Sequence, residues 1–505
     1  MSAAPRASTA GAVPGTLNLG NSVRALLRRS LEVYGDSPQA AGWLRMHLAR
    51  FDEPLRVAIA GKVKAGKSTL LNALVGEAVA PTDAGECTRV VTWYQDGNSP
   101  KVILHPKDSP PRPLSIHRRD GALSFDLGGL PPDRIDRLVV DWPTQSLRGT
   151  TLIDTPGIDS LSAETSARSH QFLAPEDAPT AADAVIYLMR HLHSGDVRFL
   201  ESFHDQGVAR ATAVNTIAVL SRADEIGVGR LDALMSAKRI ASRYRSDDKL
   251  RDLCQTVVAV AGLLAQTGRT MQQVEFAALT ELSTLPREGM DALLLSADRF
   301  VTSDTTAALN TEQRGSLLER FGLFGVRLGV TLIRQGVNDP AKLSAELVRR
   351  SGLDDLREVL NIQFTERRDL LKARSALLAL DLVLHREPRT ASAPLAVELE
   401  RIMAGAHEFA ELRLLTALRS GAVKVPDDAR VEAEQLLGGE GGAPAARLGL
   451  DPSASADPSQ SRQAAMEALS RWRRRAENPL STRALADTAR VVVRSCEGIL
   501  ATLPR

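Results

Sequence analysis

Residues 61–68, Gly-Lys-Val-Lys-Ala-Gly-Lys-Ser, have the spacing G-x-x-x-x-G-K-S that is typical of a phosphate-binding loop. Glycines at the two fixed positions let backbone N–H groups turn toward phosphate oxygens, and the helix that follows adds a favourable dipole. We expect Lys67 to bridge the β- and γ-phosphates and the Ser68 hydroxyl to bind Mg²⁺. The alternative is a glycine-rich surface loop that matches by chance. The expected triphosphate site is lined by Gly61, Ala65, Gly66, Lys67, Ser68 and Thr69.

A second candidate group lies at the end of an apolar stretch, in the sequence Asp154-Thr155-Pro156-Gly157. An acidic side chain at the mouth of a sheet can hold a Mg²⁺-bound water, and the Gly157 N–H can sense a γ-phosphate. Many motor or transporter ATPases carry an acidic residue directly after this aspartate to polarise water. Thr155 occupies that position here, so the motif favours a GTPase.

A third group is a threonine between these two motifs, because a GTPase needs one to complete Mg²⁺ coordination when the γ-phosphate is present. Thr92 alternates with apolar neighbours in a predicted strand, and Thr82 directly follows Pro81 near the end of a helix. We therefore expect Thr88 to be the metal ligand. A plain loop residue is the alternative.

The stretch Ser221-Arg222-Ala223-Asp224 contains the candidate base-reading residue. A carboxylate just past a parallel strand can accept both the N1–H and the N2–H₂ of guanine, a donor pair that adenine lacks. Ser221 and Arg222 replace the usual Asn or Thr and Lys. Arg222 has a comparable stem and a flat guanidinium that stacks on a base. The alternative is an acidic strand end with no ligand. A second base contact is expected from the backbone at Ala261, Gly262 or Leu263.

These groups need a sheet to position them, and strand patterns alternate with helical ones through the first half of the chain. The strands are expected at residues 56–60, 90–95, 101–105, 137–142, 149–154, 182–189, 216–221 and 256–262. This alternation predicts an α/β domain with a mainly parallel sheet and helices on both faces. After about residue 305 the apolar period is near 3.6, which predicts helices. This helical pattern is interrupted by two predicted loops or linkers, at residues 386–394 and 438–460.

Composition limits the class of protein. The chain has 505 residues, 43% of them apolar, and a formal net charge of +2, so no global field favours nucleic acid. Cys87, Cys254 and Cys496 lack metal-site spacing, which favours reduced thiols in the cytoplasm. The first fifteen residues lack the apolar segment of an export signal, and no run of eighteen apolar residues predicts a membrane span.

The order and spacing of GKVKAGKS, ECTR, DTPG and SRAD resemble the bacterial dynamin-like GTPases. The resemblance is greatest to their actinobacterial isoniazid-inducible branch and its shorter, C-type member. This resemblance is carried by three stretches, GEAVAPTDAGECTRVVTWY, SRADEIGVGR and LLERFGLFGVR. It runs from about residue 21 to the C-terminus, and the segment before it, residues 1–20, is expected to be a disordered tail. The resemblance implies an N-terminal helix over 21–50 that joins a helical neck, and a GTPase domain over 51–367. A helical-bundle neck and trunk over 368–505, with a flexible loop at 438–460, completes the implied organisation.

The resemblance also implies an activity. Family members hydrolyse GTP on dimerising through their nucleotide faces, and they bend, tether or cut membranes. The implied partners are a guanine nucleotide, Mg²⁺, an anionic membrane surface and a second copy or a paralogous dynamin-like protein. The implied location is the cytoplasm, with peripheral association at the inner face of the plasma membrane. By position, the nucleotide and Mg²⁺ residues are Gly61, Lys67, Ser68, Thr88, Asp154, Gly157 and Asp224.

Two departures from the family pattern concern catalysis. Eukaryotic dynamins have Gln and Ser where this chain has Val63 and Lys64, and Ile158 replaces a position close to the catalytic Gln of many small GTPases. We hypothesise that Lys64 supplies positive charge in cis or across a dimer. A solvated lysine is the alternative.

The membrane-contacting segment and the function class stay open at this stage. Candidate contacts are residues 322–330, the arginines 471 and 473–475 around Trp472, and the loop that contains Leu448 and Leu450. A buried helix and a solvated helix face are the preferred interpretations of the first two. The alternative functions are an assembly or regulatory GTPase acting on RNA or a protein, and a nucleotide-binding scaffold with little turnover. Low charge, 4% aromatic residues and helical accessory segments argue against RNA, so no nucleic acid is expected.

Overall fold

The computed structural model describes most of the chain. The described residues are 14–81, 89–119, 122–127, 129–157, 172, 178–202, 215–227, 230–245, 247, 249–250, 253–303, 309–419, 421–450 and 458–503. Thr82, Cys87, Thr88 and Ile158 lie outside them, so the expectations placed on these residues stay predictions.

A nine-stranded sheet forms the centre of the molecule, in the order β11-β10-β9-β1-β8-β2-β7-β3-β4. Strands β11, β10, β9, β1 and β8 are parallel neighbours, and β2 then pairs antiparallel with β8. The mainly parallel sheet and the eight expected strands are confirmed. The strands are β1 (Leu55–Gly61), β2 (Thr92–Asp96), β3 (Lys101–Pro106), β4 (Arg112–Leu114), β7 (Ile135–Trp142), β8 (Thr150–Asp154), β9 (Ala184–Met189), β10 (Thr216–Ser221) and β11 (Val257–Val260). The short β4 was not predicted, nor was the separate hairpin of β5 (Ile116–Arg119) and β6 (Ala122–Phe125).

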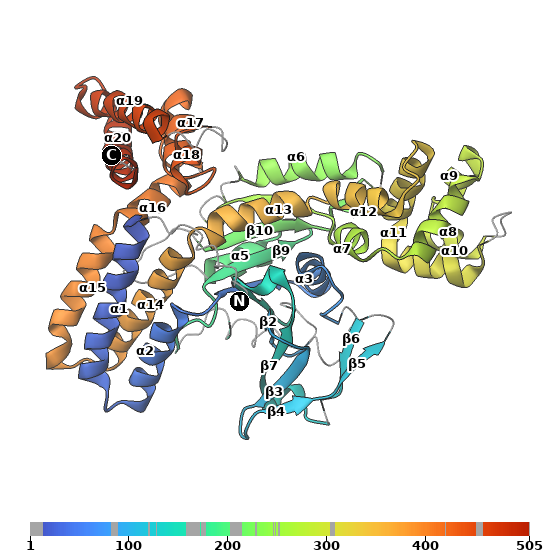
Figure 1. Ribbon diagram of the computed structural model, residues 1–505, viewed down its shortest axis with the longest axis horizontal. Coiled ribbons are helices and arrows are strands. Elements are labelled where there is room, and N and C mark those ends of the chain that lie inside the picture. The colour runs from blue at the N-terminus through green and yellow to red at the C-terminus, as the bar shows by residue number, and fades with distance from the viewer. Residues whose placement is uncertain are drawn as a thin grey trace, which may run out of the picture.

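Helices cover both faces of this sheet (Figure 1). Strand β1 shows why: Val57 and Ile59 belong to one apolar core, and Ala58 and Ala60 to the other. A strand buried on both faces is typical of a parallel sheet. The covering helices are α3 (Lys67–Val75), α5 (Ser194–Ser202), α6 (Ala233–Arg245), α7 (Gly262–Thr270), α11 (Thr311–Arg334), α12 (Pro340–Arg349) and α13 (Leu353–Leu360). Helices α8 (Gln273–Ser283), α9 (Arg287–Leu293) and α10 (Ala297–Thr302) lie farther from the sheet, beside α11 (Figure 1).

A helical bundle beside the sheet combines helices that precede the sheet in the sequence with helices that follow it. Its helices are α1 (Pro14–Tyr34), α2 (Pro38–Arg50), α14 (Arg368–Arg386) and α15 (Ala393–Gly405), and they share one apolar core (Figure 1). Val23 and Leu26 of α1 pack in this core with Leu377 and Leu380 of α14. Because α1 begins at Pro14, residues 14–20 are helical and the expected tail over 1–20 is wrong for them.

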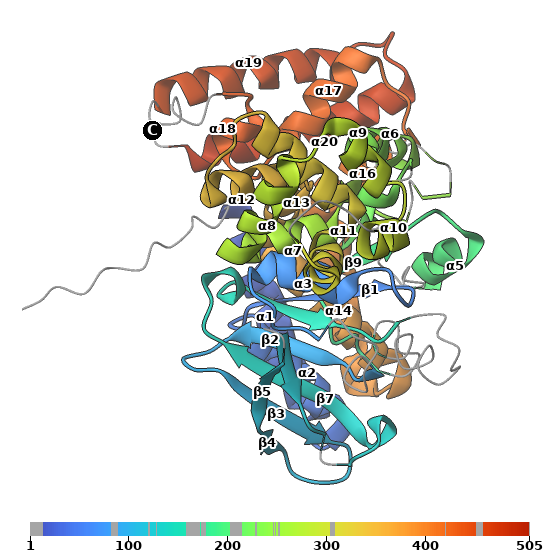
Figure 2. The ribbon, with the colours of Figure 1, turned by 90° about the vertical axis from the view of Figure 1, so that its right-hand side faces the viewer.

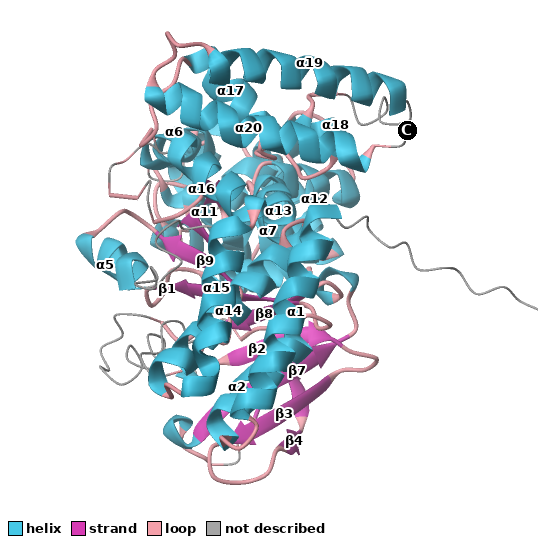
Figure 3. Ribbon diagram, turned by 90° about the vertical axis from the view of Figure 1, so that its left-hand side faces the viewer, coloured by secondary structure: helices cyan, strands magenta, loops and turns pink. Residues whose placement is uncertain are grey.

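A second group of helices follows and lies at the end of the molecule opposite β3 and β4 (Figure 3). It contains α16 (His407–Arg419), α17 (Asp427–Leu436), α18 (Pro444–Arg447), α19 (Pro458–Glu477) and α20 (Arg483–Thr502). Trp472 and Val492 are fully buried in its core. We call this group the distal helices.

The loop expected to be flexible over 438–460 is packed over 438–450. Arg447 is 8% exposed, its Nε donates to the Leu436 carbonyl at 2.7 Å, and its guanidinium pairs with Glu411 at 2.5 Å. Burial raises the pKa of Glu411, but the Arg447 charge, the hydrogen bonds from His407 and Ser495 and the His407 charge together outweigh burial and lower this pKa to about 2. The prediction of flexibility is therefore wrong for these residues, and 451–457 lie outside the described part.

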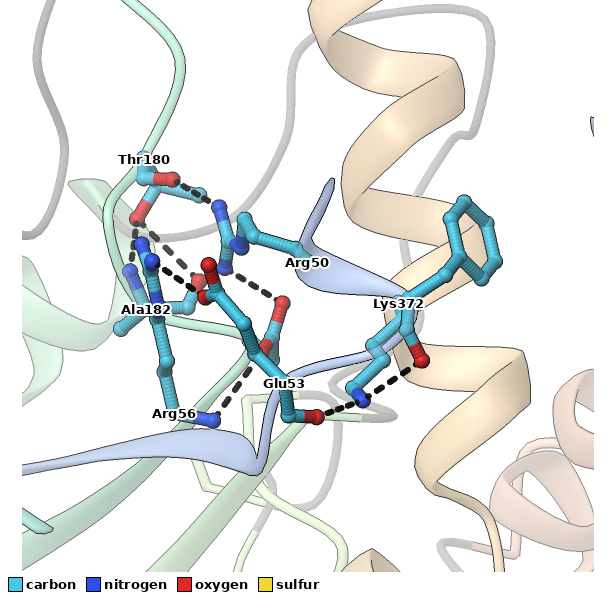
Figure 4. Close-up of polar contacts among 8 residues, drawn as sticks. Arg50, Glu53, Arg56, Thr180, Ala182 and Lys372 are labelled. Carbon is cyan, nitrogen blue, oxygen red and sulfur yellow. Dashed lines mark hydrogen bonds and ion pairs between the residues drawn. The ribbon is translucent and has the colours of Figure 1, made fainter. Parts of the chain in front are cut away.

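A buried ion pair fixes the bundle to the sheet (Figure 4). Arg50, the last residue of α2, pairs with Asp183 at 2.5 Å, and the two side chains are 2% and 1% exposed. The other Asp183 oxygen accepts the backbone N–H of Arg56 at 3.0 Å, and Arg50 Nη1 donates to the Thr180 carbonyl at 3.0 Å. Asp183 therefore binds the bundle and β1 with one carboxylate.

Lys372 of α14 contacts the short segment that connects α2 to β1 (Figure 4). Its ammonium donates to the carbonyls of Phe51 and Glu53, which lie between α2 and β1. We call this set of contacts, centred on Arg50, Asp183 and Lys372, the neck joint. It lies where β1 and β9 begin.

The ion pair of the neck joint should dominate local stability, because removing one partner leaves the other charge buried. We expect Asp183→Asn and Arg50→Met each to lower the free energy of unfolding by about 3 kcal/mol. The double variant should lose less than the sum, since neither charge is then left alone. Urea denaturation measures all three.

The matched control is Asp487→Asn, which breaks the exposed pair of Asp487 and Arg490 on α20, where the side chains are 54% and 67% exposed. It should cost less than about 1 kcal/mol. A loss for Asp183→Asn as small as that of the control would contradict this role of the joint.

Candidate nucleotide-binding site

Three predicted motifs meet at one edge of the sheet because their strands run parallel. Ile59 of β1 pairs with Asp154 of β8, and Gly61 pairs with Leu188 of β9. Leu220 of β10 pairs with Met189 at the end of β9. The phosphate loop, the DTPG segment and the SRAD segment all leave their strands at this edge, as the sequence predicts.

The phosphate loop has the backbone that its glycines allow. Gly61 has φ 148°, and a Cβ there would lie 2.5 Å from the Leu188 carbonyl oxygen. Gly66 has φ 94° and precedes α3, so both positions require glycine. Lys67 Nζ donates to the carbonyls of Gly61 and Lys62, each at 3.2 Å. Burial lowers the pKa of Lys67, and the nearby Asp154 opposes that shift.

Asp154 and Ser68 form the part of the site that fits a metal ion. Ser68 Oγ donates to Asp154 Oδ2 at 2.8 Å, whereas Oδ1 is buried and has no hydrogen-bond partner among the described residues. Burial raises the pKa of Asp154, and Lys67 and Ser68 act in the opposite direction. A hydroxyl beside a carboxylate oxygen that lacks a partner is a donor set that suits Mg²⁺.

Gly157 closes against the phosphate loop. A Cβ at Gly157 would lie 2.5 Å from Val63 Cγ2 and 2.9 Å from Val63 Cα, so only glycine permits this approach. Thr155 fixes the segment, because its hydroxyl donates to the Ile59 carbonyl at 2.9 Å. The structure thus places the Gly157 backbone beside the loop, as the sequence predicts.

A cavity next to the phosphate loop contains the residues predicted to read the base. Asp224 is 9% exposed there, and burial raises the pKa of its carboxyl. The lining residues are Ala65, Gly66, Thr69, Leu70, Leu188, Val219, Ser221, Arg222, Asp224, Glu225, Val260, Gly262 and Leu263. Its apolar walls come from strand interiors, which sequence analysis could not assign to a ligand.

The residues expected to supply a backbone contact to the base after β11 lie at the start of a helix and not in a loop. Ala261 is the N-cap of α7, and its N–H donates to the Ser351 carbonyl at 2.8 Å. Gly262 and Leu263 line the cavity. Of the three residues considered, Ala261 is therefore not available through its N–H.

Arg222 connects the base cavity to the phosphate loop. It has φ 51°, its Nε donates to the Lys64 carbonyl at 3.1 Å, and its guanidinium pairs with Glu225 at 2.5 Å. Glu225 also binds Arg190 at 2.6 Å. Sequence analysis missed Glu225 and Arg190, although Glu225 directly follows Asp224. The Ser221 hydroxyl is used inside the sheet, where it donates to the Met189 carbonyl at 3.2 Å.

In the nucleotide-free protein, the ionised and buried Asp154 carboxylate should lower the free energy of unfolding. Because its folded pKa is raised, its stabilising contribution is present in acid and is lost as pH rises through that pKa. We expect Asp154→Asn to raise the melting temperature of the nucleotide-free protein, and to do so more at pH 8 than at pH 5. The same change should weaken Mg²⁺-dependent GTP binding by about 10- to 100-fold.

Asp96→Asn, at the exposed end of β2, is the matched control and should change neither quantity appreciably. Thermal melts at two pH values and nucleotide titration with and without Mg²⁺ measure both effects. An Asp154→Asn variant that melts lower than wild type at pH 8, or that retains Mg²⁺-dependent affinity, would contradict the assignment.

Comparison with known proteins agrees with these motifs. The model of the dynamin family matches residues 57–125. The isoniazid-induced protein IniC of Mycobacterium tuberculosis is 41% identical over 485 residues, which cover 95% of this chain and 98% of that protein. The bacterial dynamin-like protein of Nostoc punctiforme is 24% identical over 360 residues, 64% of this chain and 49% of that protein.

Among solved structures, an oligomerised bacterial dynamin pair aligns with 99% of this chain and 81% of its own, at 14% identity and a TM-score of 0.31. The identity and coverage shared with IniC decide the family. This chain belongs to the bacterial dynamin-like proteins of the dynamin family, beside IniC, and is a GTP-hydrolysing enzyme.

Proposed function

We propose that this protein is a dynamin-like GTPase in which nucleotide-dependent dimerisation moves the helical bundle and so acts on a membrane surface. One observation carries the proposal. The nucleotide site and the neck joint lie at opposite ends of the same two strands, β1 and β9. Each strand spans about 20 Å. Because the strands are rigid and buried, a shift at the phosphate loop can pass to Arg50 and Lys372.

The geometry supports the following roles. Lys67 and the loop N–H groups bind the β- and γ-phosphates, and Gly157 contacts the γ-phosphate. Ser68 and Asp154 would hold Mg²⁺, which would neutralise phosphate charge, and the sequence predicts Thr88, outside the described residues, as a third ligand. Asp224 accepts the guanine donors, Arg222 stacks on the base, and Gly262 borders it. The remaining residues of the proposed site are Gly61, Ala65, Gly66, Thr69 and Ser221.

Lys64 is the loop lysine that we assign to catalysis. Lys67 turns inward, and Lys62 pairs with the buried Asp196 at 3.5 Å. Lys64 is exposed, with φ 61°, and it has no ion-pair partner within the described part of the chain. Its ammonium is thus available to stabilise charge on the transferred phosphoryl group, in cis or across a dimer.

The rim of the nucleotide site supports dimerisation through this face. The apolar Val63 is 45% exposed, and the side chains of Arg190, Arg222 and Glu225 are 49%, 37% and 45% exposed. A second copy, or a paralogous dynamin-like protein, would cover Val63 and exclude water from the phosphates.

The membrane half of the proposal rests on membership of the family. No helix in the described ranges is both long and apolar enough to cross a bilayer, so we propose peripheral binding. We place the protein in the cytoplasm, at the inner face of the plasma membrane.

Replacing Lys64 tests the catalytic proposal. Removal of one charge-stabilising donor typically costs about 100-fold in turnover, so we expect Lys64→Ala to lower GTP turnover by that factor at protein concentrations where dimers form. Lys64→Arg keeps the charge and should retain most activity. The measurement is phosphate release against protein concentration, with GDP affinity as a check on folding. Turnover of Lys64→Ala equal to wild type at every concentration would refute the role.

A further inference from the structure

Two of the segments in which the sequence suggested a membrane contact are packed in the structure: residues 322–330, and the loop that contains Leu448 as far as residue 450. Residues 322–330 lie in α11, where Phe324, Val326 and Val330 are buried beside the sheet. The preferred interpretation of that segment as a buried helix is therefore confirmed. Leu448 packs against the core of the distal helices. None of these residues can reach a bilayer without unfolding part of the molecule.

The arginines around Trp472 are mostly paired. Arg471 and Arg475 bind Glu432 of α17 at 2.9 and 2.6 Å, and Arg473 binds Glu497 of α20 at 2.7 Å. Trp472 itself is fully buried beneath Arg475. This cluster therefore holds the distal helices together, and Arg474 remains exposed on its outer side.

The turn that joins α19 to α20 presents a different surface. Leu480 is 91% exposed, the highest value among the large apolar side chains that the structure describes. It follows Pro479, which is also exposed. Figure 2 shows α19 along the upper edge of the molecule, so its end lies at the periphery. We call residues 478–483 the hairpin tip.

The hairpin tip is preformed. Asn478 Oδ1 accepts the Leu480 N–H at 2.9 Å, and the Ser481 N–H donates to the Asn478 carbonyl at 3.0 Å. Ser481 Oγ donates to the Arg475 carbonyl at 2.8 Å. The turn therefore holds Leu480 outward at little further cost in conformational entropy when it meets a surface.

Charge indicates which surface it meets. Residues 458–503 contain eight arginines and four carboxylates, a net charge of +4, whereas the whole chain carries only +2. Arg483 lies within the tip and its side chain is 97% exposed, and the exposed Arg474 lies four residues before the tip begins. Arg471, Arg473 and Arg475 are held in ion pairs with Glu432 and Glu497, whereas Arg474 and Arg483, the latter 3.8 Å from Asp487, are the exposed cations nearest to the leucine.

We propose that the hairpin tip binds anionic lipid headgroups, with Leu480 entering the acyl boundary and Arg474 and Arg483 contacting phosphates. This deepens, and rests on, the membrane half of the proposed function. A single apolar side chain flanked by arginines suits a lipid interface, where the chain enters and the cations stay at the headgroups. A protein interface needs a wider apolar patch than one leucine.

One tip binds weakly, because one inserted side chain and two nearby arginines give only modest affinity. Two tips on one dimer bind the same vesicle with a higher effective affinity. Vesicle binding should therefore strengthen when a non-hydrolysable GTP analogue promotes dimerisation.

The test is co-sedimentation of the full-length protein with vesicles of equal parts phosphatidylglycerol and phosphatidylcholine, with the GTP analogue present. We expect Leu480→Ser to weaken binding at least about 10-fold, since its polar side chain cannot insert. Met466→Ser is the matched control, because Met466 is 57% exposed on the same hairpin but away from the tip. It should bind as wild type does, and both variants should keep wild-type GTP turnover without vesicles.

Further arms separate the possible failures. Arg474→Glu/Arg483→Glu should also lose binding, and pure phosphatidylcholine vesicles should bind poorly. Equal binding by Leu480→Ser and wild type would contradict lipid binding by the hairpin tip, while leaving the membrane half of the proposed function in place. No binding by wild type to either vesicle would overturn both. Loss of binding in Met466→Ser as large as in Leu480→Ser would also overturn the tip, because the effect would then belong to the whole hairpin.

Discussion

The parallel register of β1 with its neighbours is the constraint on which the site depends. β1 lies between β8 and β9, and this places the phosphate loop, Asp154 and the end of β9 at one edge. β10 then adds Asp224 at the same edge. A slip of one residue would turn every β1 side chain to the opposite face and separate Ser68 from Asp154. The two apolar cores that bury β1 hold this register.

Buried charge has opposite consequences at the two ends of the sheet. At the nucleotide edge, Asp154 has a raised pKa and an oxygen without a partner among the described residues, a cost that a bound cation would relieve. At the other edge, Asp183 is fully satisfied by Arg50 and the Arg56 backbone. We therefore propose that the first site responds to ligand, whereas the second stays rigid. A rigid joint at the far end of β1 is what the transfer of a small shift to the helical bundle requires.

Much of the fold and site could be predicted from the sequence, because period-2 and period-3.6 apolar patterns and the phosphate-loop spacing are local signals. The eight expected strands, the helices after residue 305 and the phosphate loop between β1 and α3 are of this kind. Contacts between distant residues could not be predicted. Arg50 and Asp183 are 133 residues apart, and Arg447 fixes the supposedly flexible loop through Glu411. Likewise, residues 1–20 were expected to be a tail, but α1 begins at Pro14, and its residues from Leu19 onward pack in a core shared with α14. Thr88 stays a prediction.

The central claim is that one cavity selects guanine through Asp224 while Ser68 and Asp154 hold the metal ion of the triphosphate. Titration calorimetry of the nucleotide-free protein with GTP and with ATP, each with and without Mg²⁺, tests it most directly. We predict that GTP binds at least about 100-fold more tightly than ATP when Mg²⁺ is present, because adenine leaves the buried carboxylate unpaired. Equal affinity for the two nucleotides, or no binding of either, would contradict the account.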